Sequence, residues 1–170
     1  MPDAGMSRIV IGPQGRRFAS LGYEDSEEIY GVLKAYGRLY DDDVLDDFLG
    51  LFTQNAVFYP NWPGFAPAEV SGKKAIADFF GGRRQVASSN GVRPHHYATN
   101  MLITSAGDDT AEATVSMLYA ESVHGKAEVK MLGQYDYALV KQQGRWFISR
   151  WSMRYDNFIA PSFHSQGEGG

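Results

Sequence analysis

Arg93-Pro94-His95-His96-Tyr97-Ala98-Thr99-Asn100 opens the part of the chain that decides the fold. From about residue 95 to residue 157 the sequence reads as four long strand-like runs. Turn sequences at 107–109, 124–126 and 143–144 separate these runs, and each turn contains glycine. Long strands joined by short turns predict a strongly curved antiparallel meander.

The sequence before this meander has a helical pattern. Asp25 and Glu28 have the spacing of a capping box, and apolar residues recur at helical spacing over 29–40. A second, short helix is predicted over 44–52, followed by a strand over 56–59.

A third helix completes this half, with Ser71 as its cap and Gly81-Gly82 as its end. Helices first and an antiparallel sheet second predict an α+β fold. The expected shape is a cone, with three N-terminal helices packed in the curved sheet. The open mouth of such a cone is a natural site for a small ligand.

The ends of the chain differ from its middle. Residues 1–22 are rich in Gly and Arg, with one short apolar run at Ile9-Val10-Ile11, and are interpreted as an arm. Residues 23–158 form the predicted domain. Residues 159–170 end in Gly-rich sequence and are expected to be a largely disordered tail.

Composition narrows the range of partners. A net charge of −4 without a basic stripe argues against nucleic acid or an anionic membrane surface. No apolar run approaches the length of a membrane span, and the N-terminus lacks the pattern of a secretory signal, so a cytoplasmic location is expected. Cysteine is absent, which excludes thiolate catalysis. Aromatic residues make up 14% of the chain, more than a small core needs, so some are expected to line a pocket.

The most reactive candidate is the histidine pair at the head of the meander. Imidazole titrates near neutral pH, so a pocket histidine can move protons without a cofactor. Because strand side chains alternate, His96 is assigned to the pocket and His95 to solvent. For the same reason the two cannot bind one metal ion, so no metal site is expected. A carboxylate from the acidic run 41–43 would orient the His96 ring and stabilise its charged form.

Other interpretations of these residues stay open. Asp41, Asp42 or Asp43 can cap the second helix, and His96 can be a satisfied core histidine. Nothing local to the sequence decides which of the three carboxylates faces the cavity.

Several short motifs along the chain together resemble those of a known protein family. The landmarks, which extend over about 25–157, are Tyr40-Asp41, 51–58, the helix start 71–76, the run 96–100 and Gly144-Arg145-Trp146. Their order is similar to that of the NTF2-like superfamily, and within it to the SnoaL-like branch that includes scytalone dehydratase, ketosteroid isomerase relatives and a dehydrochlorinase. This resemblance implies the cone fold and a ligand inside it. The reaction is less defined, because this fold carries many functions.

The resemblance also implies a set of catalytic residues. Asp41 and His96 match an aspartate and histidine that the family pairs, and Tyr40 and Tyr59 fall where the dehydratase places two tyrosines. Glu121 stands near the position of its second histidine. Alternatively, this carboxylate lies at the cavity rim and pairs with an Arg or Lys.

The groups that select a substrate differ from those relatives. Tyr135 replaces an asparagine of the dehydratase, and Trp151 stands where the dehydrochlorinase has an arginine. The predicted apolar walls are formed by residues of the loop and of the strands: Phe58, Trp62, Phe65, Met117, Tyr119, Tyr135, Trp151 and Met153.

Together these features predict a cofactor-independent lyase. Such an enzyme would eliminate water, or an aldehyde such as formaldehyde, from a small aromatic and possibly lignin-derived substrate. An isomerase or polyketide cyclase, and a non-catalytic binding or assembly subunit, are the alternatives. A homo-oligomer is expected, with a trimer favoured over a dimer.

Overall fold

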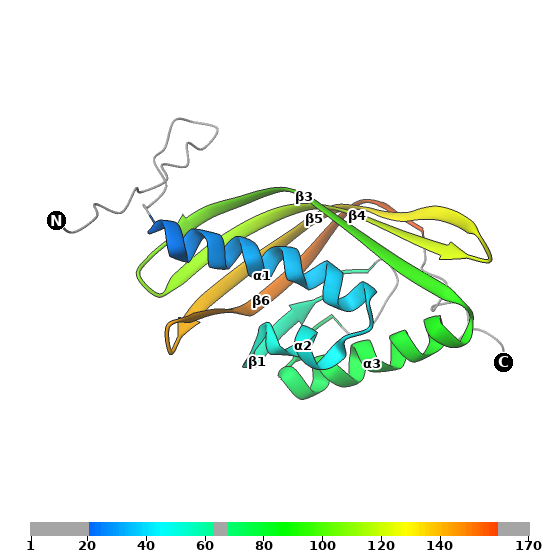
Figure 1. Ribbon diagram of the computed structural model, residues 1–170, viewed down its shortest axis with the longest axis horizontal. Coiled ribbons are helices and arrows are strands. Elements are labelled where there is room, and N and C mark those ends of the chain that lie inside the picture. The colour runs from blue at the N-terminus through cyan, green and yellow to red at the C-terminus, as the bar shows by residue number, and fades with distance from the viewer. Residues whose placement is uncertain (1–20, 63–67, 160–170) are drawn as a thin grey trace.

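The computed structural model describes residues 21–62 and 68–159. Most of the predicted arm, the tail beyond residue 159 and Phe65 lie outside these residues. The elements are α1 (Tyr23–Asp41), α2 (Leu45–Gly50), β1 (Phe52–Tyr59), β2 (Val70–Ser71), α3 (Lys73–Ser89), β3 (Val92–Ala106), β4 (Thr110–Val123), β5 (Lys126–Gln142) and β6 (Arg145–Phe158) (Figure 1).

One mixed sheet forms the frame of the molecule. Its strand order is β2-β1-β6-β5-β4-β3, and the meander β3 to β6 is antiparallel, with its turns where the sequence predicts them. The prediction of a wholly antiparallel sheet is wrong at one pair, because β1 runs parallel to β6. These two strands are far apart in sequence, so no local turn pattern reveals their pairing. The two-residue strand β2, antiparallel to β1, was also not predicted.

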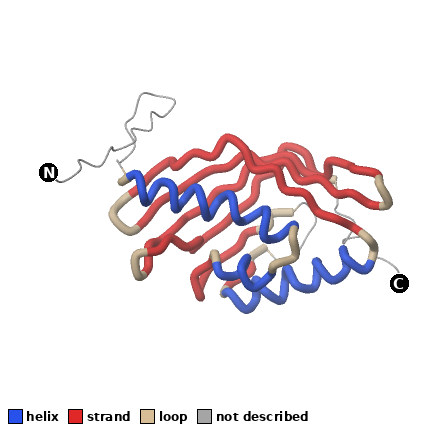
Figure 2. Tube along the Cα trace, viewed as in Figure 1, coloured by secondary structure: helices blue, strands red, loops and turns tan. Residues whose placement is uncertain are grey.

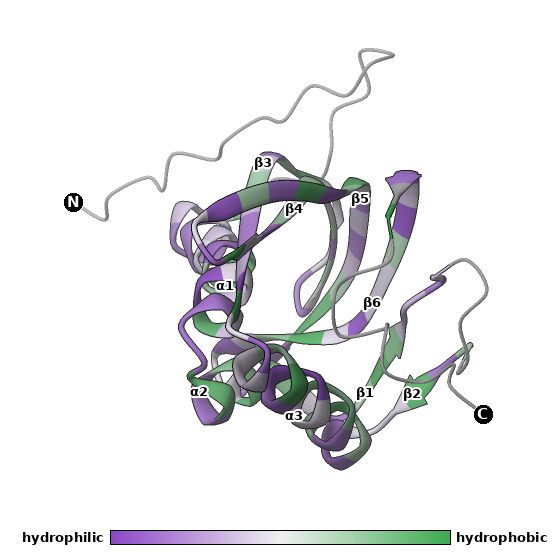
Figure 3. Cartoon of the chain, turned by 90° about the vertical axis from the view of Figure 1, so that its right-hand side faces the viewer, coloured by the Kyte–Doolittle hydropathy of each residue, from purple (hydrophilic) through white to green (hydrophobic). Residues whose placement is uncertain are grey.

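The helices lie against one side of this curved sheet. Viewed from the end, the strands bend around an interior that α1, α2 and α3 close on the remaining side (Figure 3). The sheet does not close on itself, as the tube in Figure 2 makes clear. The α+β class and the cone-like arrangement are therefore confirmed. No helix in the described part of the chain is long and apolar enough to cross a membrane.

Aromatic side chains from both layers meet in the core. Trp151 of β6 is fully buried, and its ring stacks on Phe58 of β1 at 4.0 Å between centroids. Tyr36 of α1 lies 4.7 Å from the same indole, and Phe80 of α3 stacks on it at 5.6 Å. Aromatic pairs at these separations add to the stability that burial of their area provides. The helices are thus fixed to the sheet directly beside the site described below.

The start of α1 differs from the predicted capping box. Gly22 is the N-cap residue, and no side chain caps the helix. Asp25 instead accepts hydrogen bonds from Lys141 Nζ at 2.7 Å and from Trp146 Nε1 at 2.8 Å, and Glu28 accepts one from the Trp146 backbone N–H. Both carboxylates therefore tie α1 to the β5–β6 turn, more than a hundred residues away in sequence.

The bonds of Asp25 make part of the stability dependent on pH. The bond from Lys141, followed by that from Trp146, lowers the pKa of Asp25 below its ordinary 3.8. The carboxylate therefore stabilises the fold above that pH, and the contribution is lost as the pH falls through the folded-state pKa. We expect Asp25→Asn to lower the free energy of unfolding at pH 7 by on the order of 1 kcal/mol.

Urea unfolding at pH 7 and at pH 3 measures this effect. The difference between wild type and Asp25→Asn should shrink at the lower pH. Asp108→Asn, an exposed aspartate in the β3–β4 turn, is the control and should change little at either pH. A difference that stays constant between the two pH values would contradict the assignment.

The boundaries of α3 also differ from prediction. Ser71 belongs to β2, and Gly72 at φ 90° is the N-cap residue. The helix continues through Gly81-Gly82 to Ser89, because Phe80 and Ala87 keep its face buried beyond the glycines. Tertiary packing thus outweighs the weak helix propensity of the glycine pair.

Two local features shape the sheet, one on its edge strand and one on an interior strand. β3 is an edge strand, and Pro94 occupies a position in it where the missing N–H removes no ladder bond. In β5, Gly133 lies at a register shift against β6. A Cβ on Gly133 would come within 2.0 Å of the Arg154 main-chain oxygen, so the sheet can bend here only with glycine.

Candidate active site

An aspartate and a histidine meet where α1 crosses the edge strand β3. Asp41 Oδ1 lies 2.6 Å from His96 Nδ1, and Asp41 Oδ2 accepts the His96 backbone N–H at 2.6 Å. The side chain of His96 is 6% exposed and that of Asp41 is 17% exposed. The predicted pairing is therefore present in the structure. Because both carboxylate oxygens are bound, Asp41 fixes the position and the orientation of the ring.

The close approach of α1 to β3 depends on a glycine. Gly37 lies one helical turn before Asp41, so both residues share the face of α1 that meets β3. A Cβ on Gly37 would lie 2.7 Å from His96 Cβ, closer than carbon atoms can pack. The role of Gly37 is not predictable from the sequence, because a glycine inside a helix gives no sign of which neighbour it must accommodate.

We expect Gly37→Ala to separate α1 from β3 and to lower the free energy of unfolding by about 1–3 kcal/mol. The downfield NMR resonance of the His96 Nδ1 proton should shift or disappear in the same variant. Gly31→Ala is the matched control: it lies on the same helix with nothing within 4 Å of its added Cβ. The free energy of unfolding of this control should rise by up to about 1 kcal/mol. If the two variants have the same free energy of unfolding and the same His96 resonance, the contact between α1 and β3 at Gly37 is not tight.

The neighbouring carboxylates are engaged elsewhere. Asp42 forms an ion pair with Arg38 one turn earlier, and Asp43 accepts a hydrogen bond from Arg84 Nε at 3.0 Å. His95 points to the opposite face of β3 from His96, where its Nε2 lies 2.8 Å from Ser122 Oγ. Asp41 of the acidic run and His96 of the histidine pair are therefore the two residues that contact each other.

A small cavity lies on the inner side of the His96 ring. Its volume is about 20 Å³, close to that of one water molecule, and side chains from every layer line it: Tyr36, Tyr40, Trp62, Phe80, His96, Tyr119, Met131, Tyr135 and Met153. A ring-sized ligand enters only if some of these side chains move. Met131 and Met153, which are unbranched and flexible, are suited to such movement.

Aromatic rings surround His96 on this side. Its ring centroid is 4.8 Å from that of Tyr119, 5.2 Å from Tyr40 and 5.9 Å from Tyr36. Asp41 occupies Nδ1, and no described residue hydrogen-bonds Nε2. Nε2 is therefore the ring nitrogen left for a ligand.

The tyrosines of this cavity stay neutral. Burial raises the pKa of Tyr40, with the Asp41 and Glu121 carboxylates adding to the shift and Arg84 and Arg83 opposing it. Burial likewise raises the pKa of Tyr36 and of Tyr135. These phenols therefore keep their protons near neutral pH and act through hydrogen bonds.

Glu121 is a buried carboxylate beside this group. It is 1% exposed, and the Tyr119 hydroxyl donates a hydrogen bond to its Oε1 at 2.8 Å. The structure therefore does not place Glu121 at an exposed rim. Burial, followed by the charge of Glu121, raises the pKa of Tyr119.

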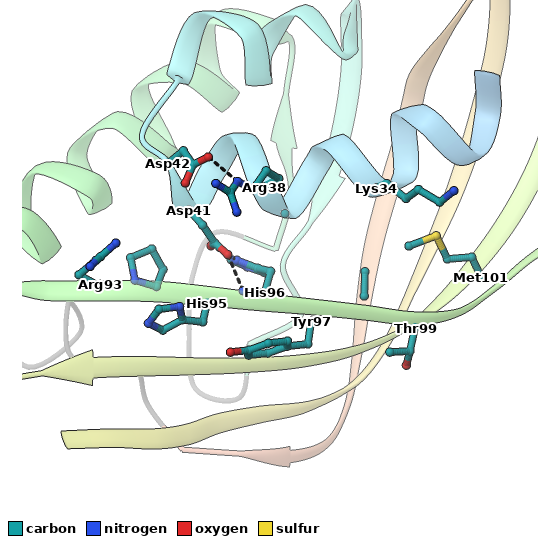
Figure 4. A pocket seen from close by; sticks show the side chains of 13 residues that line it. Lys34, Arg38, Asp41, Asp42, Arg93, His95, His96, Tyr97, Thr99 and Met101 are labelled. Atoms are coloured by element: carbon teal, nitrogen blue, oxygen red, sulfur yellow. Dashed lines mark hydrogen bonds and ion pairs between the residues drawn. The ribbon is translucent and has the colours of Figure 1, made fainter. Parts of the chain in front are cut away.

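A larger groove lies on the outer side of the same Asp–His pair. It measures about 580 Å³ and runs between α1 and β3, where Lys34, Arg38 and Arg93 contribute cations (Figure 4). Asp41 reaches across it from α1 to His96, while His95 and Tyr97 point to the other side of the strand (Figure 4). The pair therefore borders the outer groove through Asp41 and the aromatic cavity through the His96 ring.

Some predicted site residues lie elsewhere. Tyr59 follows Phe58 in β1 and points to the opposite face, near Glu69, so the structure does not bring it to His96. Strand alternation is the reason, since Phe58 takes the inward position. Phe58, Met117 and Trp151 are buried in the core but do not line the cavity. Phe65 lies outside the described residues.

Three residues of the cavity wall, Tyr36, Phe80 and Met131, are absent from the predicted site. Tyr36 was recognisable as an inward residue, because it lies one helical turn before Tyr40. Phe80 and Met131 come from α3 and β5, and only the tertiary arrangement brings them to this wall. Within the described residues, no three His, Asp or Glu side chains gather in a way that would hold a metal ion.

The curved mixed sheet with helices over its concave side is also the fold of several solved structures, among them one described as an NTF2-like protein. Residues 23–152 match the model of the SnoaL-like domain, and the chain belongs to this family. The resemblance predicted from the sequence is thereby confirmed.

Solved structures support the fold assignment. A candidate aromatic ring hydroxylase from Novosphingobium aromaticivorans is 25% identical with a TM-score of 0.66, covering 83% of this chain and 93% of that one. A variant of Rv3472 from Mycobacterium tuberculosis, of unknown function, is 20% identical with a TM-score of 0.68 and coverages of 81% and 75%. A candidate scytalone dehydratase from N. aromaticivorans is 18% identical with a TM-score of 0.65 and coverages of 78% and 84%. Comparison with curated proteins gave no match.

Proposed function

We propose that this protein is a cofactor-independent lyase that eliminates water, or an aldehyde such as formaldehyde, from a small aromatic substrate. The observation that carries the proposal is the Asp41–His96 pair, with its two 2.6 Å contacts, set against a cavity of tyrosines. An oriented imidazole with a free nitrogen is the group that a proton transfer requires.

The proposed reaction uses His96 twice. Asp41 holds the proton on Nδ1, so Nε2 carries the lone pair and can accept a proton from a carbon or a hydroxyl of the substrate. The Asp41 carboxylate offsets the positive charge that the ring then gains. In a dehydration the imidazolium returns this proton to the departing hydroxyl, which leaves as water when the C–O bond breaks. In a loss of formaldehyde the proton comes from the hydroxymethyl oxygen, which becomes the aldehyde oxygen, and the imidazolium returns it to the fragment that keeps the electrons of the broken C–C bond. His96 thus ends the cycle in its starting form.

The cavity tyrosines would stabilise the charge that develops on the substrate. Tyr36, Tyr40 and Tyr135 are buried and neutral, and among the described residues none of their hydroxyls has a hydrogen-bond partner. Preorganised donors of this kind in a dry site favour a developing oxyanion. The surrounding rings favour a flat, largely apolar substrate. The names of two similar structures, an aromatic ring hydroxylase and a scytalone dehydratase, agree with aromatic substrates.

Isomerisation or cyclisation is the second candidate, because it needs the same proton transfers without loss of a group. A non-catalytic role is the third. One similar structure is the β subunit of a candidate aromatic-ring-hydroxylating dioxygenase, 20% identical with a TM-score of 0.64. Location in the cytoplasm and assembly into a homo-oligomer, with a trimer favoured, remain predictions.

Mass spectrometry of the products tests the proposal. Purified protein is incubated with hydroxylated aromatic and diaryl compounds, alongside His96→Ala and the matched control His95→Ala, whose side chain lies on the other face of β3. Loss of the mass of water or of formaldehyde, present in wild type and His95→Ala and absent in His96→Ala, supports the lyase. An unchanged mass with an altered spectrum favours isomerisation, and no reaction with any compound favours the non-catalytic role.

A further inference from the structure

The tyrosines around the inner cavity differ in where their protons point. Each phenol has one O–H donor and an oxygen that can also accept. Tyr119 donates its proton to Glu121 Oε1 at 2.8 Å. In the described part of the chain the hydroxyls of Tyr36, Tyr40 and Tyr135 donate to no residue, so their protons are available to a ligand.

The bond to Glu121 changes what Tyr119 can offer. Tyr119 and Glu121 lie two residues apart on β4, on the same face of the strand, and both are buried. Glu121 Oε1 accepts the hydrogen bond from the Tyr119 hydroxyl, so the Tyr119 proton stays directed at Glu121. The phenol oxygen is then left as an acceptor, and the carboxylate strengthens it by polarising the O–H bond.

This acceptor lies beside the candidate base. The Tyr119 ring is 4.8 Å from the His96 ring and pairs with it across β3 and β4, where His96 and Tyr119 are register partners. The three donors lie on other elements, with Tyr36 and Tyr40 on α1 and Tyr135 on β5. The cavity therefore has an acceptor on the β4 wall and donors on the α1 and β5 walls.

We infer that the cavity selects an aromatic compound with a hydroxyl that donates to Tyr119 and a second oxygen that accepts from Tyr36, Tyr40 or Tyr135. This inference rests on the proposed function in one respect, namely that the substrate occupies the inner cavity. Glu121 acts through Tyr119 and is a positioning residue. An ether in place of the hydroxyl would set two acceptors against each other and leave the Tyr119 oxygen unpaired in a buried site, which is unfavourable.

Two probes that differ by one O-methyl group test the inference, and Tyr119→Phe separates the loss of the donor from the added bulk. Calorimetry measures the Kd of 4-hydroxyacetophenone and of 4-methoxyacetophenone without any turnover. Wild type should bind the hydroxyl compound about tenfold more tightly than the ether, the range expected when one buried hydrogen-bond acceptor is left unpaired. Tyr119→Phe should bind both compounds about equally.

Variants of Glu121 separate positioning from a general structural effect. Glu121→Gln keeps an acceptor for the Tyr119 proton and should retain the discrimination, whereas Glu121→Leu should lose it. Tyr97→Phe, with an exposed ring outside the cavity, is the matched control and should behave as wild type. Thermal melting confirms that each variant is folded.

The inference is overturned if wild type binds the ether as well as the hydroxyl compound, if Tyr119→Phe keeps the preference, or if neither compound binds. Its failure is distinct from that of the proposed lyase. If the protein prefers the hydroxyl compound through Tyr119 but converts no compound, the inference about ligand selection is supported and the proposed lyase activity is contradicted. If turnover depends on His96 but the protein shows no preference for the hydroxyl compound, the lyase activity is supported and the inference about ligand selection is contradicted.

Discussion

Replacing Asp41 with asparagine is expected to lower turnover by about a thousandfold while leaving the fold intact. Asp41 now accepts two hydrogen bonds, one from the backbone N–H of His96 and one from Nδ1–H. An asparagine has one oxygen and one NH₂ group. If its oxygen keeps the backbone N–H, its NH₂ faces Nδ1 and forces the imidazole proton onto Nε2. The nitrogen that must accept the substrate proton would then already carry one.

Steady-state kinetics on the compound that the product screen identifies would measure this loss. Asp42→Asn is the matched control, since Asp42 is the next residue and pairs with Arg38 at the outer groove, away from the aromatic cavity. It should retain nearly full activity. An Asp41→Asn variant within about threefold of wild type, well below the usual range for acid–base groups, would mean that the carboxylate does not set the tautomer of His96.

Replacing Gly133 with alanine is expected to cause the largest loss of stability. The added Cβ would lie 2.0 Å from the main-chain oxygen of Arg154 and 3.0 Å from its carbonyl carbon. Backbone atoms of a paired strand cannot turn away as a flexible side chain can, so β5 and β6 would have to separate at the register shift. We expect the free energy of unfolding to fall by about 3 kcal/mol, which is at the upper end of the range for overpacked substitutions, and Tm to fall by roughly 10 °C.

Calorimetric melting would measure this change. Gly82→Ala, inside α3 with nothing within 4 Å of its added Cβ, is the control and should become slightly more stable. If Gly133→Ala melts within about 2 °C of wild type, a shift worth under 1 kcal/mol for a domain of this size, the sheet can accommodate a Cβ and does not depend on glycine at this bend.

Patterns within short stretches of sequence predicted much of the fold. Alternation and glycine turns gave the four strands of the meander, and helical spacing gave α1. The failures share one physical cause, which is that a distant partner decided the local structure. Asp25 and Glu28 looked like a capping box but bind the β5–β6 turn. Gly81-Gly82 looked like a helix end, but the buried face of α3 continues past it.

The candidate site was predictable to the extent that it follows from strand alternation and from the family resemblance. Those two sources identified His96 and Asp41, and the structure brings them into contact. The family resemblance predicts Tyr59 at the cavity, but strand alternation turns its side chain to the opposite face of β1, near Glu69. Gly37 was not predicted, because its importance is a distance between two elements and not a chemical property of the residue.

Asp41 has a consequence for the state of the protein in solution as well as for His96. The N–H that it binds belongs to the outward edge of β3, and an unpaired N–H on a sheet edge is a place where a strand of another chain can add. Pro94, two residues earlier, has no N–H to offer at the same edge. The carboxylate therefore also guards against edge-to-edge aggregation. A substitution such as Asp41→Ala should lower solubility on storage and heating, independently of its effect on activity.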